Sequence, residues 1–128
     1  MRRQAAIKLH SGKFSFDTLG YVTAEKDNVI FEFEIDSDKM TVAACDGYAT
    51  VRREGENLYE FELETGATNE FSIATPHGLI PAGITGRKIA LRRGREPGLL
   101  IKYCLTIGGD EEERVLTLRA GVEEEFTQ

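Results

Sequence analysis

The chain has 128 residues, of which 41% are hydrophobic and 30% are charged, and its formal net charge is -6. This length and balance predict one globular domain with a core of its own and exclude a disordered chain. The acidic charge disfavours binding to nucleic acid and to anionic membranes, because both depend on basic residues. No apolar run reaches the roughly 20 residues of a membrane helix.

Basic residues interrupt the N-terminal region where a signal peptide would be apolar, so we expect a cytoplasmic protein. Cys45 and Cys104 are too far apart in sequence for a metal knuckle or a redox pair. We interpret them as two buried, free thiols in a reducing compartment.

Short segments in which apolar and polar residues alternate follow one another along most of the chain. Such alternation places the apolar side chains on one face of a β-strand. Clusters of glycine, proline, asparagine and aspartate separate these segments and predict tight turns. In chain order the expected strands cover residues 4–10, 14–23, 29–35, 40–44, 48–52, 59–64, 71–74, 79–85, 88–92, 99–107 and 114–119.

The stretch from Leu58 to Leu91 holds the clearest of these signals. Every second residue of 59–64 is apolar and the others are glutamates, which is typical of a half-buried strand. Residues 75–78 have the composition of a type I turn, with proline second and glycine fourth. Pro81 cannot donate a ladder hydrogen bond, so its strand is expected at an edge or a bulge.

No segment shows helical periodicity over three turns, and most strands carry one apolar and one charged row. A sheet with one dry face must close on itself or pair with a second sheet. We therefore expect an all-β fold, a single antiparallel meander of about 8–10 strands closed into a barrel. The barrel domain is expected over residues 1–121, and residues 122–128 form an acidic C-terminal tail.

Several short pieces of the sequence occur together in a known family. They are Thr65-Gly66-Ala67, Thr75-Pro76-His77-Gly78, Ile84-Thr85, the segment 98–103 and Ile107-Gly108-Gly109. With these pieces in this order, the chain resembles the YwiB-like family of uncharacterised bacterial proteins. The resemblance implies a cytoplasmic, calycin-like (lipocalin-like) β-barrel, and it implies no activity because a fold does not determine a function. The family often has an aromatic residue where this chain has His77.

The sequence contains no catalytic motif and no cofactor motif. There is no nucleophile elbow and no glycine-rich phosphate loop. His10 and His77 have no carboxylate or cysteine at ligand spacing, so no metal site is predicted. Asp36 and Asp38 begin like a calcium loop, but Met40 occupies the third ligand position, and we interpret the segment as a solvated turn. The sequence thus favours a non-enzymatic protein without deciding the point.

Most aromatic residues fall on the row expected to face the barrel interior, where they either line a pocket or fill a core. Core filling is the default for a small barrel, because protein interiors are closely packed. If there is a pocket, the candidate ligand-binding residues are Phe31, Phe33, Tyr59, Phe61, Phe71, His77 and Tyr103.

A basic group at residues 87–95 stands out in an acidic protein. Its arginines have the chemistry to hold a phosphate or a carboxylate, and Arg87, Arg92 and Arg93 are the candidate anion-binding residues. The alternative is that these cations pair across strands with the glutamates of 59–64 and need no ligand.

Two functions from different classes remain open at this point. The first is a non-enzymatic barrel that binds a small apolar or amphipathic ligand in its mouth. The second is an interaction module with a filled core that binds a protein partner, or a second copy of itself, through an incomplete edge near Pro81. A cavity of a few hundred Å³ open at one end would favour the first.

Overall fold

A computed structural model of the chain describes residues 2–121. These residues form ten strands and no helix, and all ten strands belong to one antiparallel sheet. The predicted all-β meander is confirmed; the predicted acidic tail at 122–128 lies outside the described residues. The strands are β1 (Arg2–Ser11), β2 (Phe14–Ala24), β3 (Val29–Ile35), β4 (Asp38–Cys45), β5 (Tyr48–Glu54), β6 (Tyr59–Glu64), β7 (Thr68–Thr75), β8 (Gly78–Arg92), β9 (Gly98–Ile107) and β10 (Asp110–Gly121).

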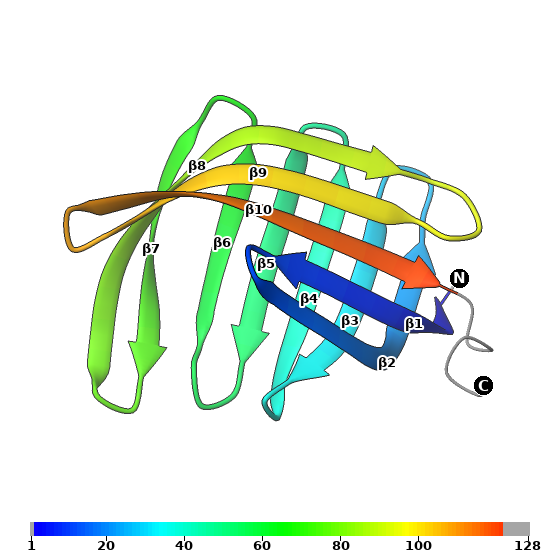
Figure 1. Cartoon of the computed structure of the whole chain (residues 1–128), viewed down its shortest axis with the longest axis horizontal. Coiled ribbons are helices and arrows are strands. Elements are labelled where there is room, and N and C mark those ends of the chain that lie inside the picture. The colour runs from blue at the N-terminus through cyan, green and yellow to red at the C-terminus, as the bar shows by residue number, and fades with distance from the viewer. Residues whose placement is uncertain (1, 122–128) are drawn as a thin grey trace.

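The strands follow the order β6-β5-β4-β3-β2-β1-β10-β9-β8-β7 across the sheet. Strands consecutive in sequence are neighbours, and β1 also pairs with β10, so the two ends of the sheet are β6 and β7. Figure 1 shows that β8, β9, β10 and β1 cross in front of β3–β6, so the sheet folds over on itself. The result is a nearly closed barrel.

The barrel closes incompletely where β6 meets β7, a region that we call the β6–β7 seam. At one end of the seam the backbones of Leu58 and Ala74 exchange two hydrogen bonds, with N···O distances of 2.9 and 2.8 Å. Farther along, the side-chain amide of Asn69 donates to the carbonyl oxygen of Glu62 at 3.0 Å. The two strands form no continuous ladder between these contacts.

At the far end of the seam, the turn between β6 and β7 forms backbone hydrogen bonds with β8. Gly66 N–H donates to the carbonyl oxygen of Gly86 at 2.9 Å, and Gly86 N–H donates to that of Ala67 at 3.1 Å. A β-bulge lies between Gly86 and Lys88, and β8 continues through it as a single strand. The sequence predicted two strands here; the bulge lets one strand continue, because it absorbs the break in alternation.

Pro81 lies in β8 opposite Ser72 of β7. On its other side, the pairing of β8 with β9 begins only at Ala82. Pro81 therefore sits where the sheet has an open side, as its missing N–H requires.

The inward rows of the strands form one core. At the end of the barrel where β1 begins and β10 ends, Ile7 and Phe31 are completely buried and Leu118 is 2% exposed. The turn before β9 closes this end, because Pro97 is fully buried and its carbonyl oxygen accepts the N–H of Ala120 at 3.0 Å.

The expectation that Asp36 and Asp38 form a solvated turn is wrong for Asp38, which is 3% exposed. Its carboxylate accepts a hydrogen bond from Arg53 Nε at 2.7 Å and one from the backbone N–H of Glu56 at 2.9 Å. Asp38 shares the inward row of β4 with Met40, so it has to be buried and needs these partners.

This buried pair predicts a change of stability with pH. The hydrogen bond from Arg53 holds the pKa of Asp38 below its ordinary value of 3.8. A folded-state pKa below the unfolded-state value stabilises the fold above the unfolded pKa, and this contribution is lost as the pH falls through the folded pKa. In urea melts between about pH 5 and pH 2, Asp38→Asn should lose less stability on acidification than the wild type.

Asp110→Asn is the matched control for this pH experiment. Asp110 is an exposed carboxylate at the start of β10, so its amide variant should lose as much stability on acidification as the wild type. Parallel pH curves for Asp38→Asn and the wild type would contradict the assigned role of the buried pair.

Candidate ligand cavity

The end of the barrel opposite the start of β1 contains a cavity of about 260 Å³. Its walls come from inward-facing residues of eight strands, β1 and β4 to β10. Among the described residues that line it, all are apolar except Tyr59, Tyr103 and Arg114. The apolar residues are Leu9, Met40, Val42, Val51, Phe61, Leu63, Phe71, Ile73, Ile84, Ile101, Leu105, Ile107 and Leu116.

Aromatic rings line the cavity along the β6–β7 seam. Tyr59 and Phe61 stack with their ring centroids 5.7 Å apart, and Phe61 meets Phe71 of β7 at 4.9 Å. Ring pairs at these separations are mutually attractive. The side chains thus hold β6 and β7 together where the backbones do not pair, and they form an apolar wall.

Polar groups of the cavity gather where β9 and β10 approach the open end. The antiparallel register places Arg114 directly opposite Tyr103. Burial raises the pKa of the Tyr103 hydroxyl, and the neighbouring Arg114 guanidinium partly opposes this rise. Arg114 also donates to a carboxylate oxygen of Glu112 at 2.9 Å, and its side chain is 40% exposed, so this end of the cavity reaches solvent.

The structure brings together four of the seven predicted ligand-binding residues, since Tyr59, Phe61, Phe71 and Tyr103 all line the cavity. Phe31 and Phe33 belong to the buried core and lie outside the lining. His77 is exposed in the β7–β8 turn, where its backbone N–H donates to the Thr75 hydroxyl at 3.1 Å.

The sequence prediction missed Arg114 as a cavity residue. In β10 the inward row contains Leu116 and Leu118, and the same period-two row reaches Arg114. Extending the alternation from Leu116 back toward the start of the strand would have identified Arg114.

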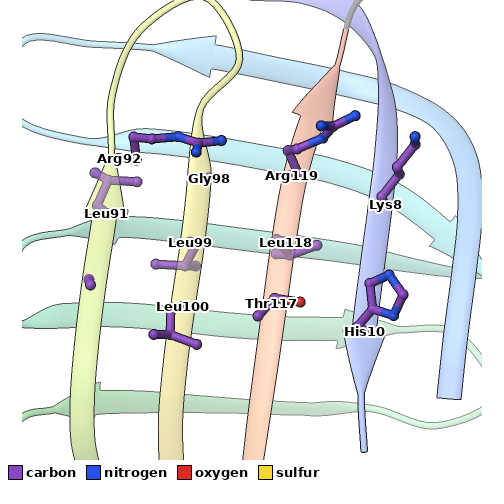
Figure 2. A pocket seen from close by; sticks show the side chains of 11 residues that line it. Lys8, His10, Leu91, Arg92, Gly98, Leu99, Leu100, Thr117, Leu118 and Arg119 are labelled. Carbon is purple, nitrogen blue, oxygen red and sulfur yellow. The ribbon is translucent and has the colours of Figure 1, made fainter. Parts of the chain in front are cut away.

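A second concavity lies on the outer face of β8, β9, β10 and β1 (Figure 2). In the cross-strand register, Arg92 and Arg119 flank Gly98, and Lys8 lies beside Arg119. Gly98 has no side chain, and the Arg92 guanidinium lies over it: a Cβ atom at Gly98 would be 3.3 Å from Nη2 of Arg92. His10 lines the same concavity and is exposed.

The structure does not gather the predicted anion-binding arginines at one place. Arg92 lines the outer concavity and donates to the carbonyl oxygen of Glu96 at 3.4 Å. Arg87 pairs with Glu113 of β10 at 3.0 Å, and Arg93 donates to the carbonyl oxygen of Glu25 at 3.0 Å. Anion binding by these residues stays a prediction.

The alternative, in which the basic group pairs with the glutamates of 59–64, is wrong about the partners. Arg87 is paired with a carboxylate of β10. Glu60 faces Arg52 of β5, at 3.5 Å, because β5 and not β8 is the hydrogen-bonded neighbour of β6.

Within residues 2–121, no group of three or more histidine, cysteine, aspartate or glutamate side chains is arranged to hold a metal ion. Cys45 and Cys104 are both free, with Cys104 buried and Cys45 partly exposed. The same part of the chain has no helix long and apolar enough to cross a membrane.

Comparison with known proteins supports the fold. The crystal structure of the YwiB protein from Bacillus subtilis superposes with a TM-score of 0.76 at 18% sequence identity, over 93% of this chain and 92% of that one. At this identity the likeness shows the fold alone. No curated protein matches the chain. The profile of the domain of unknown function DUF1934 matches residues 2–117. The chain therefore belongs to the DUF1934 family, and its resemblance to YwiB-like proteins is confirmed.

Proposed function

We propose that this protein is a non-enzymatic, lipocalin-like barrel that binds a small apolar or amphipathic ligand inside one end. The observation that carries the proposal is the cavity of about 260 Å³ with its apolar wall and one polar end. Protein interiors are normally closely packed, so an apolar space of this size is costly unless something occupies it. Its volume lies just below the range typical of drug-sized ligands, which favours a smaller molecule.

The position of the cavity also supports binding. The end of the barrel where β1 begins is filled by core residues such as Phe31, whose burial contributes stability without a ligand. The other end is lined by partly exposed side chains such as Tyr59, Phe71 and Ile73. A barrel that is filled at one end and hollow at the other is suited to hold a ligand without depending on it to fold.

Blocking the cavity should abolish binding of a neutral apolar probe. We expect N-phenylnaphthylamine to gain fluorescence with the wild-type protein and to lose most of that gain with Ile73→Trp. Ile73 lines the cavity from β7, so an indole there occupies the space of the probe. The measurement is a fluorescence titration at constant protein concentration.

Leu79→Trp is the matched control, on the same β7–β8 hairpin. Leu79 is 72% exposed, so its indole stays in solvent and the probe should bind as to the wild type. If the wild type binds no probe, or if Ile73→Trp binds it unchanged, the cavity is not a binding site. That result would favour the interaction module as the function.

A further inference from the structure

The cavity has one charged residue among the described residues that line it, and this residue determines which amphipathic ligands it suits. Arg114 lies on the inward row of β10, next to Leu116 along the strand and opposite Tyr103 across it. We propose that the ligand is a medium-chain amphiphile whose anionic head group, a carboxylate, is bound by the Arg114 guanidinium while its apolar chain fills the cavity. This inference rests on the proposed function and specifies its ligand class.

Arg114 is available for such a head group because its present partner is easily exchanged. Glu112 lies two residues away on the same strand, and its side chain is 63% exposed. Exposed ion pairs of this kind contribute little stability, since water solvates both charges almost as well. A ligand carboxylate can therefore take the place of the Glu112 carboxylate, which returns to solvent at the rim.

Arg53, a second arginine on a strand that lines the cavity, already has a buried partner. Arg53 is opposite Tyr59 in the β5–β6 register and donates to Asp38 at 2.7 Å, with side chains 18% and 4% exposed. Separating a pair with so little contact to water would leave a buried charge unpaired, which is strongly unfavourable. Arg53 therefore neutralises Asp38 and does not provide a second cation for a ligand.

The surrounding groups favour a carboxylate over a neutral or cationic head group. Guanidinium binds carboxylates through two parallel N–H donors, which adds geometric specificity to the charge attraction. Tyr59 and Tyr103 line the same cavity, and a tyrosine hydroxyl can donate a further hydrogen bond to a carboxylate. A cationic head group would be repelled by Arg114, and a purely apolar ligand would leave its charge without a new partner.

The test compares two ligands of equal chain length, decanoate and decanol, in isothermal titration calorimetry below their micellar concentrations. With Arg114→Gln we expect the affinity for decanoate to fall by at least about tenfold, and the affinity for decanol to stay unchanged. With Glu112→Gln, which removes the competing carboxylate, the affinity for decanoate should rise. The control is Arg52→Gln, an exposed arginine paired outside the cavity with Glu54 and Glu60, which should leave both affinities unchanged.

The outcomes separate this inference from the proposed function. If the wild type binds decanol and N-phenylnaphthylamine but Arg114→Gln binds decanoate as well as the wild type does, the head-group assignment is overturned and the binding barrel stands. If Arg114→Gln lowers the affinities for decanoate and decanol equally, Arg114 shapes the cavity and does not bind the head group. If neither ligand nor the neutral probe binds the wild type, the proposed function itself fails.

Discussion

Replacing Phe31 with alanine is expected to lower the free energy of unfolding by about 3–5 kcal/mol, the usual cost of deleting a buried aromatic ring. The Phe31 side chain is completely buried in the filled half of the barrel. It lies outside the lining of the ligand cavity, so neither a ligand nor the existing empty space can compensate for the lost contacts. Urea unfolding followed by circular dichroism measures the loss.

The matched control for this variant is Phe14→Ala, at the start of β2. Phe14 has the same side chain but is 48% exposed, and its main ring contact is a stack on Phe16 at 6.1 Å. Its loss should cost about 1 kcal/mol or less. Equal losses for the two variants would contradict the assignment of the filled core to the half of the barrel that contains Phe31.

The faces of the strands could be predicted from the sequence because alternation is a local property. In β3, for example, the inward row contains Val29, Phe31 and Phe33, and all three are buried as the pattern indicates. Interruptions of the alternation also place most of the turns; the exception is β8, which continues through the break at Gly86 by means of a bulge. A meander of such strands has few alternative topologies, so the nearly closed barrel followed from the pattern.

Prediction was weakest at the strand ends, where a charged residue continues an inward row. Asp38 follows the row of β4 and Arg114 follows that of β10, yet local patterns favour a solvated position for any charged side chain. Whether such a residue is buried depends on a partner from another strand. For Asp38 this partner is Arg53 of β5, and no local rule connects the two.

The division of the aromatic residues between core and cavity could not be predicted either. Phe31 and Phe61 occupy equivalent positions in two alternating strands, but only Phe61 lines the cavity. Phe61 also meets Phe71 across the seam, because β6 is an end strand of the sheet, whereas β3 lies between β2 and β4. Closure depends on contacts between β6, β7 and β8 that are not encoded in the pattern of any single strand.

Gly86→Ala should be the most damaging small substitution at the seam, with an expected loss of about 3 kcal/mol in the free energy of unfolding. A Cβ atom at this position would lie 2.4 Å from the carbonyl oxygen of Glu64 and 2.9 Å from its carbonyl carbon. Both atoms belong to the backbone of β6, so they cannot rotate away as a side chain can. The hydrogen bonds of Gly86 with Gly66 and Ala67 would have to lengthen.

Gly83→Ala on the same strand separates this steric effect from the general effect of adding a methyl group to β8. The nearest heavy atom to a Cβ at Gly83 would be 3.8 Å away, an ordinary contact, so this variant should be as stable as the wild type within about 0.5 kcal/mol. Because Ile84 lines the cavity two residues before Gly86, the wider seam of Gly86→Ala should also weaken binding of N-phenylnaphthylamine. Equal stability of the two variants would mean that the turn does not hold the barrel closed, and that the ring contacts of Tyr59, Phe61 and Phe71 are sufficient to do so.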